Sequence, residues 1–431
     1  MSWIVFSTEY LTRLCVTKSR GNLLLEIIFC GGFLLFYCGI DIAKNNHEAS
    51  IIDENGNLLT KSISFSNSQN GCEKLFKLFE KFEISSENIV IGMEATGHYW
   101  LSIYSFFIEN SFNTKVINPI QSESFRKMYI RQTKNDSKDS FIIAQIMRFG
   151  QYSETKLAEE NIIALRQLSR YRLALVDSCS DCKRRVIALL DQIFPEYQKF
   201  FSDVFGASSK EILLNCPTPE DILDISTEKL SEILNEASRG RFNIKKAENL
   251  KSIAKKSFGV SFAKDAFSFQ IKQLIEQVIF IEKQILELEN QISNLLSKTN
   301  QVITTISGIG ETLGAIIVSE IGDIQRFDSP SKLVAFAGLD VKVNQSGEFS
   351  GTKNKISKRG SPYLRRAIWL AASRATFCDS ILSDYYYSLR SRGKHHLTAI
   401  GAVARKLCNI IFVILRENRP YQIKPPLNPK F

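Results

Sequence analysis

Four acidic residues in the first third of the chain could form a metal site. Asp41 and Glu94 each interrupt or end an apolar segment that is typical of a buried strand. A carboxylate in such a place is costly unless positive charge lies against it. Asp136 and Asp139 are three residues apart at the start of a predicted helix, so they share one helix face. Asp136 alone also suits a helix N-cap, and the alternative interpretation is four unrelated surface acids.

If these carboxylates converge, they offer only oxygen donors, with neither His nor Cys among them. Such a set suits Mg²⁺ or Mn²⁺, which retain waters and bind phosphate. Two such ions about 4 Å apart can stabilise both the attacking and the leaving oxygen of a phosphodiester. The four residues are therefore predicted to be metal ligands and catalytic groups. His98, four residues after Glu94, is interpreted as a packed neighbour.

The segment from Lys342 to Arg374 combines positive charge with hydroxyl groups. It holds eight Lys or Arg residues and one Glu, a local net charge of +7. Its first part, residues 342–361, is rich in Ser, Gly, Asn and Lys and is predicted to be a mobile loop. A serine there could be a nucleophile beside the cations, and spacing does not choose among Ser346, Ser350, Ser357 and Ser361. A solvated binding surface without catalysis is the alternative.

Several cations of this segment are predicted to contact nucleic-acid phosphates. A helix is predicted to begin at Ser361-Pro362, with Ser as cap and Pro at its first position. Arginines on that helix could bind phosphate oxygens, as lysines of the preceding loop could. The predicted contacts are Lys353, Lys355, Lys358, Arg359, Arg365 and Arg366.

A glycine turn begins the distal part of the chain. The sequence Ile306-Ser307-Gly308-Ile309-Gly310 precedes a predicted helix that ends near Ile321. Such a turn exposes backbone N–H groups at a helix N-terminus, where a phosphate can bind, as in helix-hairpin-helix modules. Gly308 and Gly310 are therefore predicted to contact nucleic acid. The alternative is a tight turn between two packed helices.

Other motifs indicate little chemistry. Cys179 and Cys182 form a single CxxC within a helical stretch, with no second pair at zinc spacing. His395-His396 lacks an acidic or Cys partner at ligand spacing. The sequence contains neither a Walker-type nor a dinucleotide-binding glycine loop, so neither ATP nor NAD dependence is indicated.

The acidic residues need a sheet to position them. Residues 36–150 alternate predicted strands and helices: three antiparallel strands are followed by strand–helix alternation, which indicates an α/β arrangement with a mixed sheet. The predicted strands are 37–44, 47–53, 62–65, 89–94 and 115–118, and the predicted helices are 71–82, one from about 99, and 136–149.

The rest of the chain is predicted to be mainly helical. Residues 151–300 include a long amphipathic stretch, 163–193, and apolar residues from Ile271 to Leu295 that alternate steps of three and four. That spacing is the pattern of a coiled coil, within one chain or between chains, and a helix packed in a bundle is the alternative. The predicted division begins with an N-terminal extension (1–35) and an α/β domain (36–150). A helical linker with the coiled coil (151–300), a mainly α domain (301–420) and a tail (421–431) follow.

Length and composition agree with several domains and a polyanionic partner. The chain has 431 residues, a net charge of +10, 4 His and 9 Cys, which excludes a disulfide scaffold and a His-rich metal protein. The apolar run at residues 23–40 is about as long as a membrane span, but Glu26 and two glycines interrupt it, so no membrane insertion is predicted. A signal peptide is not predicted either, and the expected location is the cytoplasm.

Two ordered sets of motifs resemble those of a known family. The first set is Gly39-Ile40-Asp41-Ile42-Ala43-Lys44, Met93-Glu94-Ala95-Thr96-Gly97, Val116-Ile117-Asn118-Pro119 and Lys134-Asn135-Asp136-Ser137-Lys138-Asp139. The second is Ile306–Gly310, Phe336-Ala337-Gly338-Leu339, Ser346-Gly347 and Ile356-Ser357-Lys358-Arg359-Gly360. The chain resembles the DEDD-type transposases of bacterial insertion sequences, and within them the insertion-sequence one-hundred-and-ten family.

The resemblance implies a fold and a mechanism. It implies an RNase-H-like (RuvC-like) N-terminal domain whose metal-binding tetrad is Asp41, Glu94, Asp136 and Asp139. It implies a C-terminal transposase domain whose catalytic serine is Ser346. It also implies DNA recombination by a serine nucleophile with Mg²⁺ (or Mn²⁺), a structured guide RNA from the element, and pairing of protomers through the coiled coil.

Two rival functions make different predictions. A metal-dependent Holliday-junction endonuclease needs the tetrad but no serine. A non-catalytic RNA- or DNA-binding protein needs neither. The resemblance favours the transposase.

Overall fold

The computed structural model describes most of the chain in two compact units, Met1–Leu157 and Ala158–Phe431. The described residues are 17–19, 22–24, 35–95, 97–117, 119–126, 136–150, 152, 159–299, 302–341, 345–346, 349–350 and 355–423. Most of the apolar run at 23–40 lies outside these residues. The short strands β1 (Thr17–Ser19) and β2 (Asn22–Leu24) pair with each other.

The first unit is built on a mixed sheet of five strands in the order β5-β4-β3-β6-β7. Its strands are β3 (Phe36–Asp41), β4 (Asn46–Ile52), β5 (Ile63–Ser66), β6 (Ile89–Glu94) and β7 (Asn113–Ile117). β3, β4 and β5 are antiparallel, whereas β3, β6 and β7 run parallel. The predicted mixed sheet is therefore confirmed. The prediction that the first strand reaches residue 44 is wrong, because the chain leaves the sheet after Asp41 to turn into β4.

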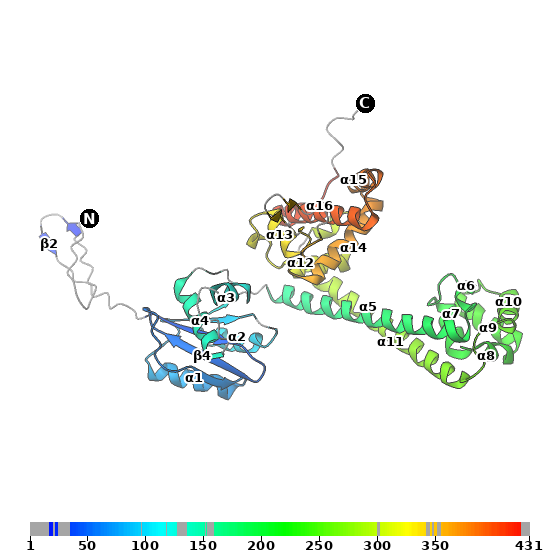
Figure 1. Cartoon of the computed structure of the whole chain (residues 1–431), viewed down its shortest axis with the longest axis horizontal. Coiled ribbons are helices and arrows are strands. Elements are labelled where there is room, and N and C mark those ends of the chain that lie inside the picture. Colours follow the sequence, from blue (N-terminus) through cyan, green and yellow to red (C-terminus); the bar gives the residue numbers. More distant parts are fainter. Residues whose placement is uncertain are drawn as a thin grey trace, which may run out of the picture. The chain divides into compact units, whose positions relative to one another are not determined.

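Helices cover both faces of this sheet. Its helices are α1 (Gln69–Lys81), α2 (Trp100–Glu109), α3 (Pro119–Arg126) and α4 (Asp136–Phe149). One face packs against α1 and α2 in a core that includes Ile40, Ile91 and Phe107. The opposite face packs against α4 in a smaller core around Ile117 and Ile143. Figure 1 shows the helices on the two sides of the strands.

The second unit is mostly helical, as predicted. Its helices are α5 (Glu160–Ile193), α6 (Tyr197–Phe200), α7 (Ala207–Asn215), α8 (Pro219–Asp224), α9 (Thr227–Ser238), α10 (Ile244–Lys255), α11 (Lys264–Ser297), α12 (Glu311–Ile321), α13 (Pro330–Phe336), α14 (Pro362–Cys378), α15 (Ser380–Ser391) and α16 (His396–Glu417), with short 3-10 helices η1 (Ile303–Thr305) and η2 (Ile324–Arg326). One core lies among α12 to α16 and the start of α5, and another lies among α6 to α10.

The two long helices α5 and α11 connect these cores (Figure 1). Each has 34 residues, which corresponds to about 50 Å of helix. The predicted apolar repeat lies on α11, where Ile271, Val278 and Ile292 are buried. Ion pairs tie the helices together, such as Arg172 Nη2 with Glu289 Oε1 at 2.5 Å. The apolar repeat of α11 therefore packs against α5 of the same chain.

The helix α16 is both long and apolar, with 22 residues. Among the described residues it is the only helix that is long and apolar enough to cross a membrane. Within its apolar 18-residue stretch, 56% is buried inside the protein. It contributes Val403, Leu407 and Ile411 to the core of the C-terminal part. Its apolar character is therefore explained by packing.

The segment predicted to be a loop contains a short hairpin. β8 (Gln345–Ser346) pairs antiparallel with β9 (Phe349–Ser350), so Ser346 lies opposite Phe349. The backbone of Ser346 is thus in a strand rather than a loop. Residues 342–344, 347–348 and 351–354, which include Lys353, lie outside the described residues.

Candidate active site

Asp41 and Glu94 lie at adjacent ends of two parallel strands. β3 and β6 are paired in register, with Ile40 opposite Met93, and each carboxylate is the next and last residue of its strand. Successive side chains of a strand point to opposite faces, so both carboxylates project to the face that α4 covers. Strand pairing alone therefore places these two acids side by side.

Glycines in the strands bring α4 close to them. A Cβ on Gly39 would lie 2.1 Å from the carbonyl oxygen of Ser140 and 2.2 Å from the amide nitrogen of Ala144. The backbone of α4 therefore rests directly on β3 two residues before Asp41. Gly92 is in a similar position, since its Cβ would lie 2.4 Å from Cγ of Met147. The fold needs small residues here so that Asp139, on the first turn of α4, can approach the strand ends.

The four predicted carboxylates interact electrostatically. The pKa of Asp41 is raised to about 6, first by its burial and then by the charges of Asp139, Asp136 and Glu94. Asp139 is 6% exposed and Asp136 is exposed at the beginning of α4. All four predicted acids therefore belong to one negatively charged region, and the interpretation as unrelated surface acids is wrong.

Two residues of α3 that the sequence did not single out complete this region. Nη2 of Arg126 lies 2.9 Å from Oδ1 of Asp139, an ion-pair distance in a geometry that makes no hydrogen bond. The same guanidinium lowers the pKa of Asp41. The buried hydroxyl of Ser122 donates to Oε2 of Glu94 at 2.7 Å. Arg126 begins a stretch of sequence that also contains Lys127, Arg131 and Lys134, and this run of cations was the only signal that could have indicated it.

The donor set fits a hard divalent cation. All four groups are carboxylates, and the buried oxygen Oδ1 of Asp139 has no hydrogen-bond partner. As they are positioned, no three acidic, His or Cys side chains in the described part of the chain are close enough together to hold a metal ion. Binding a cation between these carboxylates would therefore require their side chains to move closer together.

In the second unit, two of the four candidate serines are used in local structure. Ser357 is 8% exposed, and its hydroxyl donates a short hydrogen bond to Oδ1 of Asp340. Ser361 accepts from the amide of Leu364 at 3.1 Å as the cap of α14 and donates to Glu320 at 2.7 Å. Ser346 and Ser350 are described only by their backbone in β8 and β9.

One glycine of the turn packs against another helix, and the other leaves its surroundings open. Gly308 has φ +90°, and its Cβ would lie 2.9 Å from the carbonyl oxygen of Ala371 on α14. Gly310 caps α12, and nothing lies within 4 Å of the position of its Cβ. Gly308 therefore serves the close packing of two helices, whereas Gly310 leaves the N-terminus of α12 open.

The predicted cationic contacts divide into free and committed groups. Lys355, Lys358 and Arg359 are exposed. Arg365 is half-buried, and its Nη1 donates to the carbonyl oxygen of Ala337 at 3.3 Å. Arg366 makes a two-pronged contact with Asp177 of α5 at 2.7 and 2.8 Å. Arg366 therefore holds α14 to α5.

The weaker candidates are explained by local packing. Cys179 is buried and Cys182 is half-buried on α5, both as free thiols. His98 is exposed and its ring lies 4.2 Å from that of Tyr99. His395 caps α16, and Nδ1 of His396 lies 2.8 Å from the hydroxyl of Tyr386.

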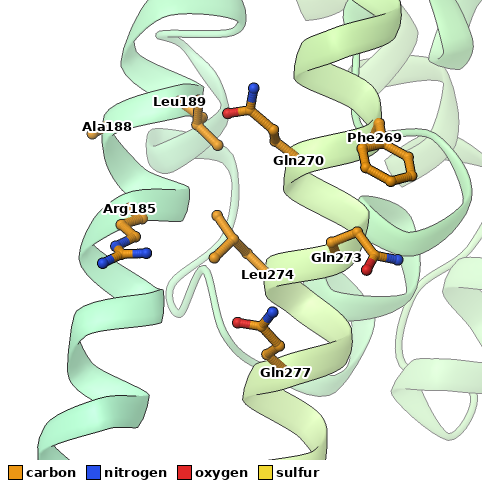
Figure 2. A pocket seen from close by; sticks show the side chains of 8 residues that line it. All are labelled: Arg185, Ala188, Leu189, Phe269, Gln270, Gln273, Leu274 and Gln277. Carbon is orange, nitrogen blue, oxygen red and sulfur yellow. The ribbon is translucent and has the colours of Figure 1, made fainter.

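A cavity of about 440 Å³ lies between α5 and α11 (Figure 2). Apolar groups such as Leu189, Phe269 and Leu274 line it, together with three glutamines and Arg185. It contains no carboxylate and no nucleophile, so it is not the site of the chemistry.

Two family models match the chain, one in each of the two regions that carry the motifs. The family model for DEDD transposases of the IS110 type matches residues 38–195, and the model for the transposase IS116/IS110/IS902 family matches residues 300–387. The chain is 25% identical to the pilin gene-inverting protein of Moraxella bovis over 89% of this chain and 97% of that protein. It is 24% identical to the mini-circle putative transposase for IS117 of Streptomyces coelicolor, over 85% of this chain and 90% of that protein. It is also 30% identical to the transposase for IS1328 of Yersinia enterocolitica, over 32% of this chain and 42% of that protein.

Proposed function

Because this chain belongs to the IS110 family of insertion-sequence transposases, we propose that it cuts and rejoins DNA with the carboxylate tetrad and Ser346. As a transposase it catalyses DNA strand transfer and binds DNA, and its family implies dependence on a divalent metal. The observation that carries the proposal is the electrostatic coupling of Asp41 to Glu94, Asp136 and Asp139 at the ends of parallel strands.

Asp41, Glu94, Asp136 and Asp139 would hold the metal, which we propose is Mg²⁺. When bound, the metal supplies positive charge that stabilises the phosphodiester oxygens during displacement. The protein contributes the geometry: β3 and β6 fix two carboxylates, and close packing of α4 on Gly39 fixes a third. Ser122 orients Glu94 by its hydrogen bond, and Arg126 balances part of the negative charge beside Asp139.

We propose Ser346 as the nucleophile. Its Oγ would lose a proton, bond to the phosphorus of a DNA strand and release one sugar oxygen as leaving group. A DNA hydroxyl would later displace the serine and rejoin the strands. The family resemblance supports this assignment, and so does the structure, because the hydroxyls of Ser357 and Ser361 are already engaged. The exposed cations Lys355, Lys358 and Arg359 would attract the phosphates.

Further features of the family are part of the proposal. The first unit would be an RNase-H-like domain, supported by three antiparallel strands joined to two parallel ones. The α5–α11 pair would act as a coiled coil and pair protomers, and the turn at Gly310 would bind a phosphate as in a helix-hairpin-helix element. A structured guide RNA from the element would select DNA in the cytoplasm, supported by the net charge of +10.

The test uses supercoiled element DNA, the full-length protein and the RNA flanking its gene. We expect a covalent protein–DNA adduct at Ser346 that Ser346→Ala abolishes, with a loss of rejoining of at least about a thousandfold, since the nucleophile is removed. Ser350→Ala, in the paired strand of the same hairpin, is the matched control and should retain the adduct. Unchanged rejoining by Ser346→Ala would refute the nucleophile assignment.

The rival Holliday-junction endonuclease shares the tetrad but needs no serine. It predicts that Asp139→Ala abolishes cutting while Ser346, Ser350, Ser357 and Ser361 are all dispensable. The adduct assay separates the two functions directly, because hydrolysis by metal-activated water leaves no protein bonded to DNA.

A further inference from the structure

Three arginines meet around one buried acid in the second unit. Arg166 and Arg170 lie one turn apart on α5, Arg326 ends η2, and Glu320 lies near the end of α12. α12 packs against α5, which brings these side chains together. The three guanidinium groups therefore compete for a single buried carboxylate.

Arg170 forms the ion pair with that carboxylate. Its Nε lies 2.6 Å from Oε1 of Glu320 and its Nη2 lies 3.0 Å from Oε2, a two-pronged ion pair. Ser361 also donates to Oε2 at 2.7 Å, and the guanidinium of Arg170 lies 4.6 Å from the ring centroid of Tyr363. Glu320 is 4% exposed, and all three hydrogen bonds of its carboxylate among the described residues come from Arg170 and Ser361.

Arg166 is held by the backbone and not by an acid. Its Nε donates to the carbonyl oxygen of Ser319 at 2.7 Å, and no other hydrogen bond or ion pair of Arg166 exists among the described residues. Burial lowers the pKa of Arg166. The charge of Glu320 raises this pKa, whereas the charge of Arg170 lowers it. The terminal nitrogens of a half-buried guanidinium are thus left for another acceptor.

Arg326 is held by aromatic rings. Its guanidinium carbon lies 4.6 Å from the ring centroid of Phe327 and 4.4 Å from that of Phe336. Within the described part of the chain it has no hydrogen-bond acceptor. Arg326 is exposed at its outer edge. Desolvation of the part that lies on the rings lowers its pKa, and so does the charge of Arg166, whereas the charges of Asp323 and Glu320 raise it. Asp323 is exposed and caps η2 by accepting from Gln325 at 2.8 Å.

We propose that Arg166 and Arg326 form a preorganised binding site for the phosphates of a nucleic-acid backbone. A carbonyl oxygen holds Arg166 and two rings hold Arg326, contacts that fix each guanidinium without neutralising it. The two charges act on each other, since the charge of Arg166 lowers the pKa of Arg326. Such an arrangement is unfavourable in the free protein, and binding of a polyanion relieves it. Arginine suits this role because its planar donors match phosphate oxygens while its face stacks on rings.

The site lies beside the start of α14. Ser361, the residue at which α14 is capped, bonds to the same Glu320 that anchors Arg170. A strand whose phosphates contact Arg166 and Arg326 would therefore pass the start of α14, where Lys358 and Arg359 are exposed. The inference rests on the proposed function only in requiring that this part of the protein binds nucleic acid.

The experiment measures binding of the full-length protein to duplex DNA of the element end and, separately, to the flanking RNA. Arg166→Gln and Arg326→Gln are each expected to weaken binding by about three- to tenfold near physiological salt, the loss of one or two phosphate contacts. The slope of log affinity against log salt should decrease by about 0.9 per lost contact on duplex DNA and about 0.7 on a single strand. The nucleic acid whose slope changes identifies the ligand.

The matched control is Arg184→Gln, which removes an exposed arginine of the same helix that forms an ion pair with Asp181. It should change neither affinity nor slope. Arg326→Lys keeps the charge and loses the planar stack, so it should keep the slope and bind more weakly than wild type. Unfolding midpoints check that the variants fold.

Unchanged slopes on both DNA and RNA for the double variant Arg166→Gln, Arg326→Gln would overturn the proposal. A weaker affinity without any change of slope would also overturn it, because that result indicates a structural role or an acidic protein partner. Ser346→Ala should lose the covalent adduct but keep the wild-type affinity and salt slope. A changed slope in the arginine variants and a lost adduct in Ser346→Ala are separate results, so failure of one proposal is distinguishable from failure of the other.

Discussion

The carboxylate region of the first unit (Asp41, Glu94, Asp136 and Asp139) and the arginine cluster of the second (Arg166, Arg170 and Arg326) both gather like charges, by different means. In the first, strand pairing and close helix packing at Gly39 force carboxylates together. In the second, a backbone carbonyl and aromatic rings hold guanidinium groups. The carboxylates can be neutralised by protons or a cation, whereas arginines stay charged at all relevant pH values. The first region is suited to reversible cation chemistry and the second to permanent attraction of phosphates.

The comparison predicts that removing one charge from the carboxylate region abolishes DNA strand transfer. Asp139→Asn keeps the size of a buried side chain but removes one of the proposed metal ligands. We expect strand transfer to fall by about a thousandfold or more, since several kcal/mol of charge stabilisation are lost. Cleavage of element ends in Mg²⁺ measures the effect.

Glu80→Gln on α1 is the control for this variant. Glu80 is exposed on the helix that covers the opposite face of the sheet. It should leave strand transfer unchanged. Full activity of Asp139→Asn would show that the carboxylates are not a catalytic set, and the contrast between the two regions would fail.

In the arginine cluster, removing the single acid should affect stability. Glu320→Gln removes the buried charge that pairs with Arg170, whose own side chain is 41% exposed. We expect the free energy of unfolding to fall by about 1 to 2 kcal/mol, less than for a fully buried ion pair because solvent screens the arginine that remains. Denaturant unfolding measures this loss, and saturating DNA should restore part of it.

The exposed pair of Lys332 and Asp328 provides the control, because solvent screens it. Asp328→Asn should leave stability within experimental error of wild type. Equal stability of Glu320→Gln and wild type would mean that Glu320 does not compensate the arginine cluster.

Sequence patterns identified the carboxylate region far better than the arginine cluster. Asp41 and Glu94 stand out because a charged residue in an apolar strand is unusual, and the strands fix which face it occupies. Arg166 and Arg170 lie on a long amphipathic helix, where a charge every few residues is the normal exposed face. Their surroundings depend on α12, about 150 positions away in the chain, which no local pattern encodes.

The same distinction applies to the residues that support the site. Arg126 and Ser122 lie on the short helix α3 and contact acids on other elements, so only the fold reveals their roles. The apolar repeat of α11 predicted a helix pair correctly, but periodicity left open whether the partner was another chain, and the partner is α5. Arg366 was predicted to bind phosphate from its helix position, yet it contacts Asp177 of that same α5.

The smallest expected effect comes from the titration of Asp41. Its pKa in the folded protein is raised to about 6 from an ordinary value of 3.8, so the unfolded chain releases this proton first as pH rises. The contribution of Asp41 to stability therefore falls between about pH 4 and pH 6 and is constant above that window. Allowing for solvent screening of a half-buried carboxylate, the fall is on the order of 1 kcal/mol.

Asp41→Asn should unfold like wild type near pH 4 and be more stable above pH 6, in thermal unfolding without divalent ions. Arg326→Gln should show the wild-type dependence on pH, because arginine does not titrate there. The opposite result would be that Asp41→Asn shows the same dependence of stability on pH as wild type. In that case the carboxylates do not raise the pKa of Asp41, and titration does not distinguish the carboxylate region from the arginine cluster.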